Sequence, residues 1–164
     1  MTALECDASG FLRLCDVSRL TERELPLAMR RIGSRAREVA QEAAPVYTPG
    51  TNKDGTPRKG HTGGTLRQSI AYQTGRDGST YWAQIGTNVH YAPYQEFGTG
   101  QRGSASYTDN QGETHVTEGL TFRGDWKGIP PHPYIRPALY DQKALYMAVI
   151  SDAVKRSVKR GGSA

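Results

Sequence analysis

The sequence predicts an α+β fold: a long N-terminal helix and a C-terminal helix pack on one antiparallel β-sheet, with long protruding loops. Three patterns predict it. Apolar residues follow helical spacing from Leu25 to Ala43 and again from Leu139 to Ala153, and apolar residues alternate on both sides of a turn at 75–78. A chain of 164 residues suits one domain, which we take as 1–164.

Composition limits the classes of protein to consider. Apolar residues make up 36% of the chain and its mean hydropathy is −0.64, which indicates a modest core. We expect no membrane span and no secretory signal, because no apolar run is long enough. Cys6 and Cys15 are too few for a disulfide framework, so we expect free thiols in a reducing cytosol. The net charge of +5 is scattered, which favours a mildly basic surface.

The first helix has the clearest start and stop signals. Thr21–Glu24 fits a capping box, with Leu20 and Leu25 as a hydrophobic staple. The helix is expected to end near Ala44, since Pro45 disfavours helical backbone at the preceding residue. A polar loop follows, and Thr62–Thr65 then offers an N-cap to a single helical turn that contains Leu66 and Arg67.

The rest of the chain alternates between short regular elements and long loops. We expect a hairpin from Ile70–Thr74 and Tyr81–Ile85 and a second one that pairs Thr114–Val116 with Leu120–Phe122. Pro137 is expected at the first position of the last helix. Segments 1–8, 48–61, 101–127 and 160–164 are expected to be mobile in the free protein.

Residues 91–100 form a compact aromatic helical turn in the prediction. Tyr91, Tyr94 and Phe97 recur every third residue and so share one side, while Gly98 or Gly100 supplies a positive φ that ends the turn. Glu96 has no cation beside it in sequence. The sequence leaves two interpretations open, a local packing element and a functional one.

No motif carries enzymatic chemistry. The letters of a dinucleotide fingerprint occur at 98–103, but a helical turn precedes them and a loop follows, so the strand and helix that this mechanism needs are absent. The four histidines lack metal-ligand spacing, and no serine or cysteine has a nucleophile context. Asp and Glu are plentiful, but nothing singles out a catalytic pair. We therefore expect no enzyme, no cofactor and no metal.

Three blocks of sequence resemble a known family. They are Ala44-Pro45 with Thr62-Gly63-Gly64-Thr65-Leu66-Arg67-Gln68-Ser69-Ile70, then Tyr91-Ala92-Pro93-Tyr94-Gln95-Glu96-Phe97-Gly98-Thr99-Gly100, and Pro131-His132-Pro133-Tyr134-Ile135-Arg136-Pro137-Ala138-Leu139. The family is named after gene product ten of phage HK-ninety-seven, and its members are tail components, the neck or tail-completion proteins of long-tailed phages. The insertion at 46–61 and the long loop at 101–127 depart from the family pattern.

The resemblance implies a structural virion protein with no chemistry. It implies a cyclic ring, hexamer or dodecamer, at the head-to-tail junction, assembled in the host cytoplasm. Its partners would be connector or head-closure proteins and tail-terminator or tail-tube proteins, with genomic DNA passing through. The residues expected to be structural or at interfaces are Leu66, Arg67, Tyr91, Tyr94, Glu96, Phe97, Gly98, Pro133, Tyr134, Arg136 and Pro137.

Two further expectations concern charged residues. We expect the aromatic turn to dock on Pro131–Pro137 within the subunit, with Arg136 as the partner of Glu96, since each lacks a counter-charge among its neighbours. The alternative function is a sequence-independent DNA-binding module. The residues that would face DNA are Lys53, Arg58, Lys59, Lys155, Arg156, Lys159 and Arg160.

Overall fold

The computed structural model describes residues 4–6, 12–14, 24–46 and 63–161, and it describes side chains over 24–46 and 63–157. Several predictions lie outside the described residues or side chains. These are the capping-box Thr21 and its neighbour Leu20, the loop at 48–61 with Lys53, Arg58 and Lys59, the cysteine thiols, most of the two terminal segments, and the side chains of Lys159 and Arg160.

Helix α1 (Glu24–Ala43) ends where the sequence predicts, just before Pro45. Its buried apolar residues follow the expected intervals of three and four: Leu25, Ala28, Met29, Ile32, Ala36 and Ala40. The prediction was wrong for Ala43, which is exposed, because Ala44 continues the buried row four residues after Ala40.

Strands β3 (Ala71–Asp77) and β4 (Thr80–Gly86) form the predicted hairpin over one side of α1. The turn expected at 75–78 was wrong, because the strand continues to Asp77 and the chain reverses at Gly78, where φ is 56°. Gly75 is a strand residue for a packing reason. The indole of Trp82, on the paired strand, lies against it and would collide with any side chain there.

The described strands form three two-stranded antiparallel sheets, where the sequence analysis expected one sheet. Besides β3–β4 these are β1 (Leu4–Cys6) with β2 (Leu12–Leu14), and β5 (Ser106–Thr108) with β6 (Thr114–Val116). The predicted pairing of Thr114–Val116 with Leu120–Phe122 was wrong. Asp109 explains the true pairing, because its side chain accepts hydrogen bonds that close the β5–β6 turn.

The final helix is bent into two pieces, α4 (Ile135–Tyr140) and α5 (Lys143–Gly161). Pro137 lies at the third helical position, whereas the sequence predicted the first. Tyr146, Ile150 and Ala153 are buried as expected, but Leu145, predicted on the same apolar side, is 45% exposed. Leu145 stands about 100° around the helix from Tyr146, which places it beyond the edge of the buried face.

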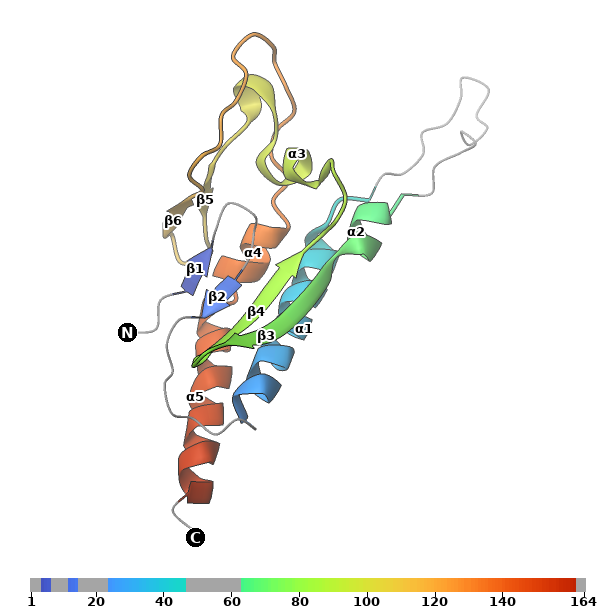
Figure 1. Cartoon of the computed structure of the whole chain (residues 1–164). Coiled ribbons are helices and arrows are strands. Elements are labelled where there is room, and N and C mark those ends of the chain that lie inside the picture. Colours follow the sequence, from blue (N-terminus) through green and yellow to red (C-terminus); the bar gives the residue numbers. More distant parts are fainter. Residues whose placement is uncertain (1–3, 7–11, 15–23, 47–62, 162–164) are drawn as a thin grey trace.

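The core lies between α1, the inner face of β3–β4, and the α4–α5 pair (Figure 1). Helix α5 runs beside α1 with its C-terminus at the same end as the start of α1, and the loops after α3 (Ala92–Phe97) project from the other end. Short helices α2 (Thr65–Ser69) and η1 (Gly100–Arg102) complete the described elements. None of the described helices meets the length and apolarity needed to cross a membrane.

Candidate functional site

Glu96 is a buried carboxylate that completes the first turn of another helix. It lies on α3, and its two oxygens accept hydrogen bonds from the backbone N–H groups of Tyr134 (2.8 Å), Ile135 (2.9 Å) and Arg136 (3.1 Å). These N–H groups stand at the start of α4, where the helix itself provides no acceptor. A negative charge there is also favoured by the helix dipole. Glu96 therefore acts as a cap supplied from a distant part of the chain.

Arg136 pairs with Glu96, as the sequence analysis expected. Its Nε donates to Glu96 Oε1 at 2.9 Å, and the two side chains are 4% and 5% exposed. The guanidinium also donates to the backbone oxygens of Glu96 and Ser106, and it lies over the rings of Phe97 and Tyr107, 4.6 and 5.5 Å from their centroids. Because the guanidinium contacts residues of α3 and β5, Arg136 joins α3, α4 and β5 at one point.

The expected docking of the aromatic turn on Pro131–Pro137 is confirmed, but the expected aromatic face is not. His132 N donates to Gln95 O at 2.7 Å, and Gly98 lies directly against Pro131. Tyr94 is 55% exposed. It lies about 200° around the helix from both Ala92 and Glu96, the two buried residues of α3, so it points away from the core.

We call residues 98–105 and 117–131 the projecting arm, which forms the end of the molecule above α3 in Figure 1. Its two limbs are joined by hydrogen bonds. Thr99 N donates to Ile129 O at 2.9 Å, Ile129 N to Thr99 Oγ1 at 3.1 Å, and Gln101 N to Trp126 O at 3.1 Å. Further along the arm Gln101 Nε2 donates to Gly124 O at 2.8 Å. The arm is thus a braced structure whose base is the Glu96–Arg136 pair.

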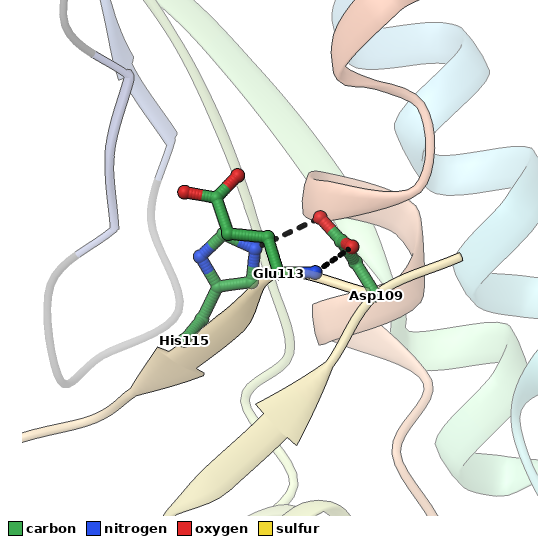
Figure 2. A group of neighbouring side chains, drawn as sticks. All are labelled: Asp109, Glu113 and His115. Atoms are coloured by element: carbon green, nitrogen blue, oxygen red, sulfur yellow. Dashed lines mark hydrogen bonds and ion pairs between the residues drawn. The ribbon is translucent and has the colours of Figure 1, made fainter. Parts of the chain in front are cut away.

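A second polar cluster joins the β5–β6 hairpin to α4. Asp109 Oδ1 accepts the N–H groups of Gln111 and Glu113, each at 2.9 Å, and its Oδ2 lies 3.0 Å from His115 Nε2 (Figure 2). The imidazole of His115 stacks on the ring of Tyr140 with centroids 3.7 Å apart. The hydrogen bond from His115, followed by those from the backbone, lowers the pKa of Asp109 below its ordinary value.

Asp109, Glu113 and His115 are residue types that bind metals, and their ligand atoms lie within 4.8 Å of one another. Both oxygens of Asp109 already have protein partners, and the exposed carboxylate of Glu113 lies 3.5 Å from Lys143 Nζ. The cluster is fully explained as a hairpin closure, so we assign it no metal.

Asp141 receives the other contacts of this hairpin, at the bend between α4 and α5. Its carboxylate accepts hydrogen bonds from the hydroxyl of Tyr107 at 2.9 Å and from the N–H of Asn110 at 3.0 Å. Burial, together with the hydrogen bond to Asp141, raises the pKa of Tyr107. The hairpin is therefore attached to the helices on the side next to Arg136.

The remaining predicted site residues have structural contacts within the subunit. Leu66 is buried, and Arg67 Nη2 donates to Ala44 O at 3.1 Å, which fastens α2 to the end of α1. Pro133 and Pro137 are half-buried beside the fully buried Tyr134. Lys155 and Arg156 are exposed on α5 and take no part in the Glu96–Arg136 site.

Comparison with known proteins decides the family. The model of the HK97-gp10-like family, bacteriophage tail components, matches residues 13–98, more than half of the chain. The protein belongs to the HK97-gp10-like family. No curated protein and no solved structure matches it. This HK97-gp10-like chain is therefore a phage tail component, and the resemblance in its sequence is confirmed.

The matched region of the HK97-gp10-like chain ends at the base of the projecting arm. Glu96 and Gly98 lie within it, while Arg136 and the β5–β6 hairpin lie beyond it. Asp109, His115 and Asp141 were not predicted from the sequence as site residues. A turn signal was available, since Asp109-Asn110-Gln111-Gly112 is a polar run ending in glycine, and Gly112 has a φ of 84°.

Acidification tests the Asp109 cluster of the HK97-gp10-like chain. Because folding lowers the pKa of Asp109, its carboxylate stabilises the fold above its unfolded pKa of about 4, and this contribution is lost as the pH falls below that value. We expect the melting temperature of the wild type to fall more steeply from about pH 5 to pH 3 than the melting temperature of Asp109→Asn. Asp152→Asn, an exposed carboxylate on α5, is the control and should follow the wild type. Parallel curves for wild type and Asp109→Asn would contradict the assignment.

Proposed function

We propose that the chain forms a ring at the head-to-tail junction of the virion. In this proposal it is a neck or tail-completion protein that joins the connector to the tail tube around the DNA channel, in a ring of six or twelve copies. The chain would assemble into particles in the host bacterial cytoplasm. Membership of a tail-component family supports a structural role and argues against an enzyme.

One observation carries the proposal: a braced arm presents large apolar side chains to solvent. Trp126 is 50% exposed and Ile129 is 39% exposed, and Tyr94 at the base of the arm is 55% exposed. Hydrogen bonds between the limbs fix the backbone at Trp126 and Ile129. Exposed apolar side chains on a fixed backbone favour burial against another protein at little cost in ordering.

The position of the arm suits a closed ring. It lies at one end of an elongated molecule, where it can reach the body of a neighbouring copy, a surface different from the arm itself (Figure 1). A contact between two different patches is the kind that closes into a ring when the rotation between copies allows it. The buried Glu96–Arg136 pair would keep the angle of the arm the same in every copy.

Electron microscopy of particles carrying Trp126→Ser and Ile129→Ser tests the proposal. We expect complete heads and complete tails that are not joined, because the arm has lost its apolar contact. An antibody label on the wild-type chain should lie at the neck. The matched control is Leu145→Ser with Met147→Ser, two exposed apolar residues of α5, and it should give joined particles. A label at the distal end of the tail, or joined particles from the arm variant, would refute the proposal.

A further inference from the structure

The end of the molecule opposite the projecting arm gathers basic side chains from three elements. Arg30 and Arg31 lie on α1, Arg76 lies next to the turn of the β3–β4 hairpin, and Lys155 and Arg156 lie in the last turns of α5. All five side chains are exposed. They contribute neither to the core nor to the Glu96–Arg136 site.

Packing between the elements brings these residues to the same end. A pocket of about 340 Å³ is lined by Met29 and Arg30 of α1 together with Arg76 and Tyr81 of the hairpin. Helices α1 and α5 run in opposite directions, with Arg35 of α1 close to the buried Tyr146 of α5 (Figure 1). Nine residues further along α5, Lys155 is therefore level with the first turns of α1.

Basic residues outnumber acidic ones among the described side chains at this end. Residues 24–31, 74–81 and 150–157 contain five basic and three acidic residues, a net charge of +2. One of the three acids, Glu24, is buried, which leaves Asp77 and Asp152 exposed. The N-terminus of α1 is at the same end and adds the positive pole of a 20-residue helix.

Arg76 is held in place before any ligand binds. Its Nε donates to Gly78 O at 2.6 Å, and its guanidinium lies over the ring of Tyr81 at 5.2 Å from the centroid. Arg30 of α1 also lines this pocket. A guanidinium group presents paired N–H donors that match the oxygens of a phosphate, and a fixed guanidinium loses little entropy on binding one.

We propose that this basic end binds the phosphate backbone of duplex DNA without reading its sequence. The inference rests on the proposed place of the chain around the DNA channel, and it adds a partner that the ring alone does not require. Charge complementarity selects the partner, since phosphate contacts supply nearly all sequence-independent binding. The pocket between Arg30 and Arg76 would receive one phosphate, and Lys155 and Arg156 would contact others.

Binding of a short labelled duplex to the purified full chain, followed by fluorescence anisotropy over a range of salt concentrations, tests the inference. The test variant combines Arg30→Gln, Lys155→Gln and Arg156→Gln. We expect its affinity at low salt to fall on the order of tenfold or more, and the slope of log K against log salt to become shallower by about three. Two duplexes of unrelated sequence should bind the wild type equally.

The matched control removes the same number of charges from the projecting arm. It combines Arg102→Gln, Arg123→Gln and Lys127→Gln, all exposed residues, and should bind duplex like the wild type. Equal losses in the two triple variants would overturn the inference, because binding would then follow net charge alone. Absence of wild-type binding at low salt would also overturn it, as would binding to anionic vesicles with none to duplex.

An experiment that refutes DNA binding by the basic end can be told apart from one that refutes the proposed ring. Duplex binding is measured on the free subunit, whereas joining is seen in particles. Particles that carry Arg30→Gln, Lys155→Gln and Arg156→Gln should still join heads to tails, because the arm is intact. Unjoined particles from this variant would overturn the assignment of its residues to DNA alone.

Discussion

Replacing Glu96 by alanine is expected to lower the free energy of unfolding by about 3–5 kcal/mol, because it leaves the buried guanidinium of Arg136 without a counter-charge. The same change removes the acceptor for three backbone N–H groups at the start of α4, including those of Tyr134 and Ile135. Chemical denaturation followed by the tryptophan signal measures the change. Where the variant folds, we expect particles with complete heads and tails that are not joined, because the base of the arm has been released.

Two further variants separate charge from packing at this site. Glu96→Gln keeps the shape and the acceptor oxygen but loses the charge, so it should lie between wild type and Glu96→Ala in stability. Glu118→Ala removes an exposed carboxylate of the arm and should change stability by less than about 0.5 kcal/mol. If Glu96→Ala is as stable as Glu118→Ala, the site is not the anchor of the arm. Fully infectious joined particles from Glu96→Ala would contradict its role in joining.

Replacing Gly98 by alanine is expected to lower the free energy of unfolding by roughly 2–5 kcal/mol, from backbone strain and overpacking together. Gly98 has φ 72° and ψ −170°, a combination that is nearly confined to glycine. A Cβ there would also lie 2.6 Å from Ile129 O and 2.7 Å from Pro131 N. Both contacts are with backbone, which cannot rotate away as a side chain can. Thermal unfolding measures the loss.

Gly119→Ala is the matched control for Gly98→Ala. Gly119 also has a positive φ, 77°, but no atom lies within 4 Å of a Cβ placed there. It therefore carries a cost in strain of about 1–3 kcal/mol without the collision. Equal destabilisation in the two variants would show that the close approach of the two limbs at Gly98 has no energetic importance.

The parts of the fold that the sequence predicted are those set by local periodicity. The buried face of α1 follows from the spacing of its apolar residues, and its end follows from the backbone limits that Pro45 imposes. The β3–β4 hairpin follows from the alternation of apolar residues in its two strands. The turn of that hairpin was misplaced because Gly75 and Gly78 both permit a reversal. Only the indole of Trp82, a tertiary contact, shows that Gly75 belongs in the strand.

The candidate site also has a part that the sequence predicted and a part that it did not. The pairing of Glu96 with Arg136 was predicted because two charges without neighbours of opposite sign need each other if both are buried. The capping of α4 by Glu96 was not predictable, since nothing in the sequence places three N–H groups next to a carboxylate some forty residues away. Tyr94 was misjudged because repetition every third residue does not say which side of a short helix faces inward.

The braced arm separates what the chain must conserve from what it can vary. The second limb leaves the β5–β6 hairpin at Thr117, whose N–H donates to Ala105 O at 3.0 Å, and it returns to the first limb at Ile129. Extra residues near Gly119, where no atom lies within 4 Å of an added Cβ, would lengthen a surface loop between these two fixed points, at about 0.6 kcal/mol for each doubling in length. An insertion there would leave the hydrogen bonds at Trp126 and Ile129 in place. A peptide tag grafted at 118–121 should therefore be tolerated.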